Sequence, residues 1–207
     1  DVFIIPSWLS GMDPSRLLLA SDDITSARGN RTFLSGQDAD YHYLNGPGPI
    51  DNGPRGFFIN AVNWAASGSG MGIVALADGW RGTGSTWMNN VNSFLYDELN
   101  GHLNYFQEEN VNIVAGQENF PVNEGLTSAG LSNWGTSSHM GFSIATPGYE
   151  VINTSGSNQA FGVTLVTAGQ ADGGTDGGVS IPEPASLAVF SLGLLGLGWT
   201  RKKRSQV

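Results

Sequence analysis

Short apolar runs, each bounded by turn-forming residues, recur along the first 170 positions of the chain. Continuous apolar runs of this length favour strands that are buried on both faces of a sheet. We therefore predict strands at each of the strongest runs, which are Val2–Ile5, Leu17–Ala20, Thr32–Leu34, Ile73–Ala77, Val111–Val114 and Val163–Val166.

Two segments between these runs have apolar residues at helical spacing. The first begins after Pro54, a residue that suits the first turn of a helix, and stops at the Ser-Gly-Ser-Gly stretch from Ser67. The second begins near Ser85, which could cap a helix, and ends at Asn100-Gly101. Its predicted apolar face consists of Trp87, Met88, Val91, Phe94, Leu95 and Leu99.

A helix between two apolar strands is the pattern of a parallel βαβ unit, and residues 73–114 show it. The pattern predicts a three-layer α/β fold with a mostly parallel sheet, helices on both faces and a single hydrophobic helix at the C-terminus. From Tyr149 the sequence is more purely β-like, which predicts an antiparallel addition at the sheet edge. The alternative is a β-sandwich, which the many Gly, Asn, Ser and Thr residues would suit.

Charge is distributed unevenly along the chain, whose formal net charge is −9. Four of the nine basic residues lie together at the C-terminal end, as Arg201, Lys202, Lys203 and Arg204. The rest of the chain is correspondingly more acidic, which excludes nucleic acid as a partner because phosphate backbones are bound by Lys and Arg clusters. The absence of cysteine excludes thiolate nucleophiles, thiolate metal sites and disulfides.

The last 27 residues combine three physical features, a Pro-Glu-Pro cluster, an uncharged apolar stretch and the basic block. As a helix, residues 185–200 would extend about 24 Å, which is short of the bilayer hydrocarbon core of about 30 Å. Basic residues favour the cytoplasmic side of a membrane. The tail therefore predicts a short membrane span at residues 185–200, with residues 1–180 on the outer side of that membrane.

This tail closely resembles the PEP-CTERM sorting signal of Gram-negative bacteria. Pro182, Glu183 and Pro184 match its motif, residues 187–199 its helix, and residues 201–204 its basic stop. The resemblance implies export through the Sec translocon, transient residence in the inner membrane, and cleavage by exosortase, a membrane cysteine transpeptidase. It also implies a connection with exopolysaccharide and biofilm. The alternative is an ordinary C-terminal anchor that contains Pro-Glu-Pro by chance.

A glycine-rich stretch with few charges precedes the tail and predicts a flexible linker. Its Asp172 and Asp176 lack the spacing and the terminal glutamate of a calcium-binding EF-hand loop. The predicted organisation is an exported globular domain at residues 1–168, a linker at 169–180 and the sorting signal at 181–207.

Candidate chemistry in the globular domain centres on the run GQDADYHY. Asp38, Asp40 and His42 alternate there, so in an extended chain they would project to one side, where they could bind a divalent cation or act as acid and base. His139 and Asp78 are further candidates. The alternative for each is a structural role in a polar loop. Apart from such a cation, no cofactor is expected.

The layout is also similar to class I glutamine-amidotransferase-like, flavodoxin-type folds. The run GIVALADGW, at Gly72–Trp80, occupies the place of their nucleophile elbow, but Asp78 stands at the turn and the chain has no cysteine. Amidase chemistry is therefore not expected. A Ser-His-Asp triad drawn from Ser35, Ser137 or Ser138 with a histidine and Asp78 would lack the G-x-S-x-G elbow.

Three functions remain open at this point. The first, which we favour, is a non-catalytic exported envelope or matrix protein. The second is a secreted hydrolase that uses Asp38, Asp40, His42 or His139. The third is a carbohydrate-binding module that stacks sugars on tryptophans such as Trp80 and Trp134. A site would require three loops to meet at one end of the sheet, namely Gln37–His42, Leu76–Trp80 and Glu124–His139.

Overall fold

The computed structural model of the protein describes residues 1–7, 14–44, 50–76 and 87–169. The chain divides into two compact units, Asp1–Gly173 and Gly174–Val207. The second unit, with the sorting signal and the span expected at 185–200, lies outside the described residues. The domain boundaries expected at 168 and 180 therefore stay predictions, and the description below concerns the first unit.

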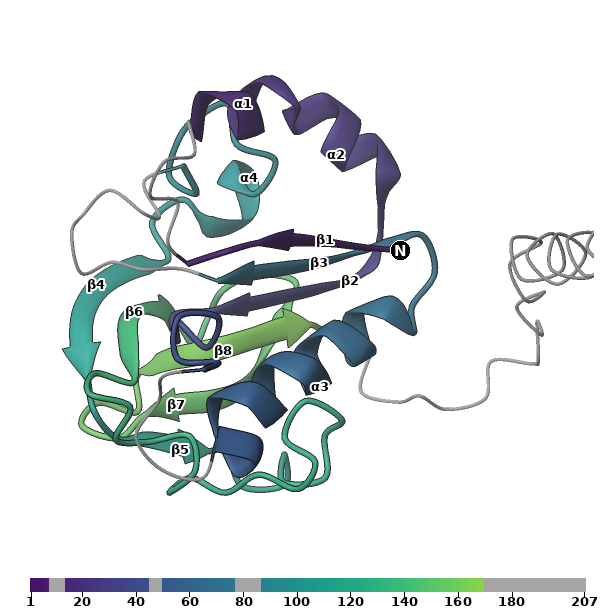
Figure 1. Cartoon of the computed structure of the whole chain (residues 1–207). Helices are drawn as coiled ribbons and strands as arrows, with labels where there is room; N and C mark the ends of the chain where they lie inside the picture. The colour runs from purple at the N-terminus through teal and green to yellow at the C-terminus, as the bar shows by residue number, and fades with distance from the viewer. Residues whose placement is uncertain (8–13, 45–49, 77–86, 170–207) are drawn as a thin grey trace, which may run out of the picture. The chain divides into compact units, whose positions relative to one another are not determined.

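Helices and strands alternate at first along the chain and then give way to strands alone (Figure 1). In order they are β1 (Val2–Ile5), α1 (Pro14–Leu19), α2 (Ser21–Ala27), β2 (Arg28–Ser35), the 3-10 helix η1 (Ile50–Asn52), α3 (Pro54–Ala66), β3 (Met71–Leu76), α4 (Tyr96–Leu99), β4 (Leu103–Glu108), β5 (Val111–Ile113), β6 (Ser138–Ser143), β7 (Tyr149–Ser155) and β8 (Phe161–Thr167).

The N-terminal part forms three parallel strands in the order β1, β3, β2, and α3 connects β2 to β3. Helix α3 begins at Pro54, as predicted, and buries Phe57, Ala61 and Trp64 at helical spacing. These side chains pack on Phe33 and Val74 from the sheet in one of the two hydrophobic clusters of the core. The expected helix after Pro54 is confirmed, because both its start at proline and its apolar face match the prediction.

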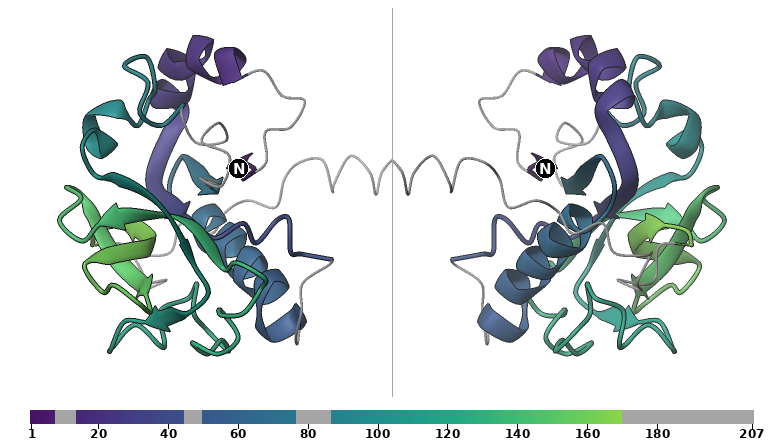
Figure 2. Two further views of the ribbon diagram at one scale, coloured as in Figure 1. Left: turned by 90° about the vertical axis from the view of Figure 1, so that its left-hand side faces the viewer. Right: turned by 90° about the vertical axis from the view of Figure 1, so that its right-hand side faces the viewer.

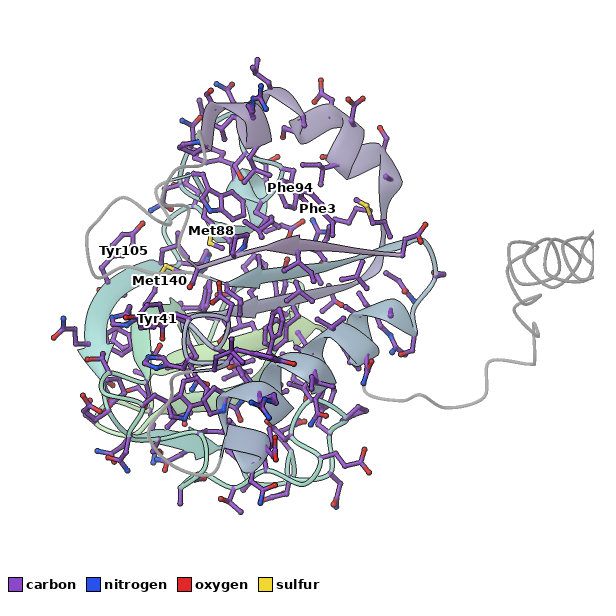
Figure 3. All side chains as sticks on the ribbon, viewed as in Figure 1. Phe3, Tyr41, Met88, Phe94, Tyr105 and Met140 are labelled. Carbon is purple, nitrogen blue, oxygen red and sulfur yellow. The ribbon has the colours of Figure 1, made fainter. Side chains whose placement is uncertain are left out.

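The opposite face of the same strands is covered by α1 and α2 (Figure 1). Leu34, Ile73 and Ala75 point to this side, because alternate strand residues face opposite ways, and they cluster with Ile24 of α2. Figure 3 shows Phe3, Met88 and Phe94 on this side of the sheet. The run Leu17–Ala20, predicted as a strand, instead lies at the end of α1 and the start of α2.

The predicted three-layer α/β fold with a mostly parallel sheet is wrong. In the described part of the chain, eight strands form one mixed sheet in which β2 pairs antiparallel with β8, and β4 to β8 pair only antiparallel. The fold is β-rich, and the antiparallel strands curl away beside α3 (Figure 2). The antiparallel addition expected at the edge instead occupies the centre, because β8 lies next to β2.

The second predicted helix is also wrong, because residues 87–95 form turns and only α4 is helical. Local side chains satisfy the backbone in place of helical bonds, since Asn90 Oδ1 accepts the Asn92 N–H at 2.9 Å and Ser93 Oγ accepts the Leu95 N–H at 3.2 Å. The βαβ unit expected at residues 73–114 is therefore absent: β4 pairs with β6 and β5 with β7.

Strand β8 forks the sheet, because β2 and β6 share one of its edges while β7 lies along the other. Gly36 lies at this fork. Its N–H donates to the Val163 carbonyl of β8 at 2.8 Å, and its carbonyl accepts the N–H of His139 in β6 at 2.9 Å. A Cβ at position 36 would lie 1.8 Å from the carbonyl oxygen of Met140. The junction of the three strands therefore requires glycine.

Glu108, at the end of β4, joins the outer antiparallel strands. Its buried carboxylate accepts hydrogen bonds from the hydroxyls of Ser155 and Ser157, and from the backbone N–H groups of Asn110 and Ser157, both at 2.9 Å. Burial raises the pKa of Glu108, but these hydrogen bonds outweigh it and lower the pKa to about 2. Glu108 is therefore ionised in the folded protein and holds the β7–β8 turn against β4.

We predict that Gly36→Ala destabilises the protein by about 3 kcal/mol, because the new Cβ forces apart the backbones of two strands. Gly125→Ala is the matched control, since Gly125 has open space around it and a φ of 72°, so it should lose only about 1 kcal/mol of backbone strain. Urea unfolding followed by circular dichroism measures both. Equal losses in the two variants would contradict the role of Gly36.

Candidate functional site

A cluster of polar side chains lies at the carboxyl ends of the parallel strands, the edge where ligands bind in open α/β sheets. Ser7 follows β1, and the segment Gln37–His42 follows β2. His139 reaches the same place from the start of β6, because its N–H pairs with the Gly36 carbonyl. The fork in the sheet therefore brings a C-terminal strand to an edge that N-terminal strands define.

Asp38 is the centre of this cluster. The Asp38 side chain is 8% exposed and lies between two imidazoles. The Nε2 atom of His42 is 3.5 Å from Oδ1, and that of His139 is 3.4 Å from Oδ2. Both rings are also buried. The carboxylate thus favours an N–H on the Nε2 atom of each ring.

A single helical turn brings Asp38 and His42 together. The backbone N–H groups of Tyr41 and His42 both donate to the Asp38 carbonyl, at 3.0 and 3.2 Å, so the two side chains lie four residues apart on one face. The chain is therefore not extended here, which is the condition under which Asp38, Asp40 and His42 would project to one side. His42 and Asp38 do meet, but through helical and not strand periodicity.

Asp40 is bound to Ser7 at the end of β1. It accepts the backbone N–H of Ser7 at 3.0 Å and the Ser7 hydroxyl at 2.7 Å. Burial raises the pKa of Asp40, and the bonds from Ser7 partly offset this effect. Asp40 thus joins the end of β1 to the turn after β2, which is a structural role beside the cluster.

The segments 37–42 and 131–139 are tied together by further contacts. The side-chain amide of Gln37 donates to the Leu131 carbonyl at 3.0 Å, and the rings of His42 and Trp134 have centroids 5.9 Å apart. Two of the three loops that a site requires therefore meet. Of the third, Leu76–Trp80, only Leu76 is among the described residues, so the candidate Asp78 stays a prediction.

The serines proposed for a triad have structural partners. Ser35 Oγ donates to the Val163 carbonyl at 3.3 Å, Ser137 Oγ to the Glu109 carbonyl at 2.9 Å, and Ser138 Oγ to the Met140 carbonyl at 2.8 Å. With their protons committed to the backbone, these hydroxyls serve to hold strands and turns in place. The cluster is thus suited to acid–base chemistry or to hydrogen bonding of a ligand.

Several buried atoms of the cluster have no hydrogen-bond partner among the described residues and are available for such a bond. His42 Nδ1 is buried and has no hydrogen-bond partner among the described residues. When Nε2 carries the proton that faces Asp38, Nδ1 has a lone pair that can accept a proton or a hydrogen bond. Asp38 Oδ1 and Gln37 Oε1 are likewise buried without a hydrogen-bond partner among the described residues, so the cluster has spare acceptor capacity at more than one side chain.

Metal binding finds no support within the structure's described ranges, where no three or more His, Asp or Glu side chains are placed to hold an ion. The divalent cation considered for Asp38, Asp40 and His42 stays a prediction. Asp40 is directed to Ser7, and the two histidines flank opposite oxygens of Asp38.

Trp134, one of the tryptophans proposed for sugar stacking, is not available for it. Trp134 is 1% exposed, and its indole N–H donates to the Gly130 carbonyl at 2.9 Å. Trp64 and Trp87 are equally buried, while Trp8 and Trp80 lie outside the described residues. The buried rings therefore stabilise the core and do not form a sugar-binding face.

Ser7 was missed at the level of sequence, while Gln37 was named only as the start of a candidate loop and Trp134 only as a candidate for sugar stacking. Ser7 follows the predicted strand Val2–Ile5 by two residues and Gln37 follows the predicted strand Thr32–Leu34 by three, which is a usable signal for a strand-end site. No local signal marks Trp134, because its approach to His42 depends on the pairing of β6 with β4 and β8.

Comparison with known proteins identifies the tail. Residues 180–202 match the family model of the PEP-CTERM protein-sorting motif, so the motif predicted at Pro182, Glu183 and Pro184 is confirmed. The chain is an exported protein that exosortase sorts to the cell surface or the extracellular space. No curated protein and no solved structure matches the chain, so the similarity to glutamine-amidotransferase-like folds is not confirmed.

The match to the sorting motif does not by itself establish the membrane span expected at residues 185–200. Within the ranges that the structure describes, no helix combines the length and the apolar character needed to cross a bilayer. The span itself falls beyond those ranges and stays a prediction.

We predict that Asp38→Asn destabilises the protein by about 2 kcal/mol. In the native protein each of the two buried imidazoles faces a carboxylate oxygen, which accepts hydrogen bonds. The amide would replace one of these oxygens with an NH₂ group, so one imidazole would face a donor. Asp51→Asn is the matched control, since Asp51 makes an exposed ion pair with Arg55 at 2.9 Å and should cost about 0.5 kcal/mol or less. Thermal unfolding of both variants near neutral pH measures the difference. A loss at Asp38 no larger than that at Asp51 would show that the carboxylate does not hold the histidines.

Proposed function

We propose that the protein is a non-catalytic component of the cell envelope or the extracellular matrix, delivered by exosortase and associated with exopolysaccharide or biofilm. The match of residues 180–202 to the sorting motif carries this proposal. A tail that exosortase recognises commits the attached domain to the cell exterior, where polysaccharide is abundant.

The apolar segment and the basic block of the tail support one route of export. The chain passes through the Sec translocon, and the apolar segment 185–200 stays transiently in the inner membrane while the basic residues 201–204 remain on the cytoplasmic side. The first 180 residues are then periplasmic. Exosortase cleaves near Pro182–Pro184 and releases the acidic domain to the surface or the medium.

The interior of the domain supports a non-catalytic role. The candidate nucleophiles Ser35, Ser137 and Ser138 donate to backbone carbonyls, so their protons are engaged in stabilising the sheet. Asp38 is buried between two histidines, and Asp40 is bound to Ser7. Each of these interactions strengthens the junction between the parallel and antiparallel strands.

Sorting is tested by expressing the chain in a host with exosortase and in the same host without it. With the enzyme, we expect a shortened product at the surface or in the medium. Without the enzyme, or with Pro182, Glu183 and Pro184 changed to Ala, we expect the uncut chain in the membrane fraction. Asp172→Ala in the linker is the control and should be processed normally. The same size and location in all samples would contradict the proposal.

A secreted hydrolase is the second candidate, and the convergence of Asp38, His42 and His139 favours it. In that case His42, oriented by Asp38, would act as the general base toward water. A panel of chromogenic esters and glycosides would show turnover that falls roughly 100-fold in both Asp38→Asn and His42→Gln, with Asp51→Asn unchanged. Absence of turnover, or turnover that these variants do not affect, rejects this candidate.

A further inference from the structure

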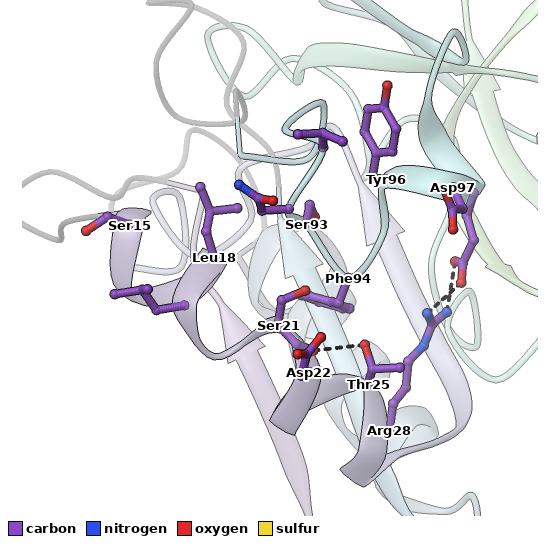
Figure 4. Close-up of a pocket in the computed structure, with 14 residues that line it drawn as sticks. Ser15, Leu18, Ser21, Asp22, Thr25, Arg28, Ser93, Phe94, Tyr96 and Asp97 are labelled. Atoms are coloured by element: carbon purple, nitrogen blue, oxygen red, sulfur yellow. Dashed lines mark hydrogen bonds and ion pairs between the residues drawn. The ribbon is translucent and has the colours of Figure 1, made fainter.

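A groove of about 800 Å³ lies on the α1–α2 side of the molecule, away from the Asp38 cluster (Figure 4). One wall is formed by α1, α2 and the start of β2, and the other by residues 91–98. Its volume falls within the range of about 300 to 1,000 Å³ that is typical of ligand sites.

The groove includes an apolar surface that the core supports. Leu18 and Phe94 line it and are both half-buried against the hydrophobic cluster on this face of the sheet. The Phe94 ring stacks on the buried Trp87 ring, with centroids 5.7 Å apart and an interplanar angle of 23°. Because Trp87 has little room to move, Phe94 presents a rigid apolar surface to a ligand.

Polar side chains surround this surface on both walls. Asp22 and Thr25 are exposed on α2, while Asn92 and Asp97 are exposed on the facing segment, together with the half-buried ring of Tyr96. Carboxylates, amides and hydroxyls supply both donors and acceptors. Hydroxyl-rich ligands need that combination, and their C–H faces pack on apolar rings.

The charges of the residues that line the groove determine which ligands it can bind. Arg28 is the basic residue among those that line it, and its guanidinium is engaged by Glu98 at 2.7 and 3.0 Å and by the Tyr149 hydroxyl at 3.0 Å. The charge of Arg28 is thus balanced by Glu98. Asp22 and Asp97 then leave the groove with a net negative charge, which repels an anionic ligand.

Two exposed apolar residues flank the polar walls. Leu19 of α1 is 84% exposed and Val91 of the facing segment is 71% exposed, and both line the groove. Single exposed apolar side chains are common on protein surfaces, so Leu19 and Val91 add apolar area to the groove without by themselves indicating a ligand.

We propose that this groove binds a neutral or amino-sugar segment of a polysaccharide. The inference rests on the association with exopolysaccharide in the proposed function, and it adds the place and the charge class of the glycan. Hydroxyl groups of the sugar bond to Asp22, Asn92 and Asp97, and its apolar face packs on Phe94 and Tyr96. Polyuronates and other acidic glycans are excluded by the two carboxylates.

Calorimetry on the full chain in detergent micelles tests the proposal with three tetrasaccharides. We expect cellotetraose, which is neutral, and fully deacetylated chitotetraose, which is cationic, to bind. Tetragalacturonate, which is anionic, should bind at least about tenfold more weakly, a difference of about 1.4 kcal/mol. Binding of none of the three, or preferential binding of the anionic one, overturns the proposal.

Two pairs of variants locate the binding. Thr25→Trp fills the groove and should weaken binding about tenfold or more. Ser26→Trp on the same helix is its control, because Ser26 is exposed, does not line the groove and makes the same type of bond to a backbone carbonyl as Thr25. Equal effects of the two, or none from Thr25→Trp, place the ligand elsewhere and overturn the proposal.

The second pair tests the charge. Asp22→Asn with Asp97→Asn should raise the affinity for tetragalacturonate and lower that for deacetylated chitotetraose, whereas the exposed Asp23→Asn outside the groove should change neither. Unchanged selectivity in the double variant overturns the exclusion of anions. These outcomes are independent of the exosortase experiment, since a chain that is sorted normally but binds no glycan refutes the groove alone.

Discussion

The close approach of three backbones at Gly36 is the constraint on which the rest of the domain depends. β2 ends there between β8 and β6, with hydrogen bonds to Val163 and His139. Any side chain would collide with the Met140 carbonyl, so the strands can meet only at a residue without a Cβ. This junction converts a parallel three-stranded sheet into a mixed one and makes β8, rather than a further parallel strand, the neighbour of β2.

The candidate site is a direct consequence of that junction. The residues after Gly36 form one helical turn, which aligns His42 with Asp38, and the pairing with β6 supplies His139 from the other end of the domain. A carboxylate buried this deeply needs partners, because an isolated buried charge is strongly unfavourable. The two imidazoles lie 3.5 and 3.4 Å from its oxygens, so the same contacts that could serve chemistry also join the strands at the fork of the sheet. The surrounding bonds, from Ser7 to Asp40 and from Gln37 to Leu131, reinforce this arrangement.

The groove on the other face of the sheet has a different origin. It exists because residues 87–95 form turns in place of the helix that their apolar spacing predicts. Asn90 and Ser93 bond to nearby backbone N–H groups, which leaves Trp87 and Leu95 buried and Val91 exposed. A continuous amphipathic helix over these residues would have turned Val91 inward with Trp87 and Leu95. Local hydrogen bonding thus outweighed hydrophobic periodicity, and the result is a polar wall opposite α2.

The sequence by itself determined the features that depend on neighbouring residues. The Pro-Glu-Pro motif, the apolar stretch and the basic block are recognisable as a linear signal, and the strands near residues 2–5, 32–34, 73–76 and 163–166 and the helix after Pro54 follow from local patterns. It also indicated Asp38, His42 and His139 as candidate site residues. His42 was selected for its strand-like alternation with Asp38, whereas helical periodicity brings the two side chains together. Only the tertiary structure decided that β8 inserts beside β2, that Asp40 turns to Ser7, and that His139 reaches Asp38. The contact of Asp40 with Ser7 joins residues 33 apart in the chain. The other two outcomes depend on pairing between segments at least about a hundred residues apart, and the apolar pattern of a buried strand is the same whichever neighbour it pairs with.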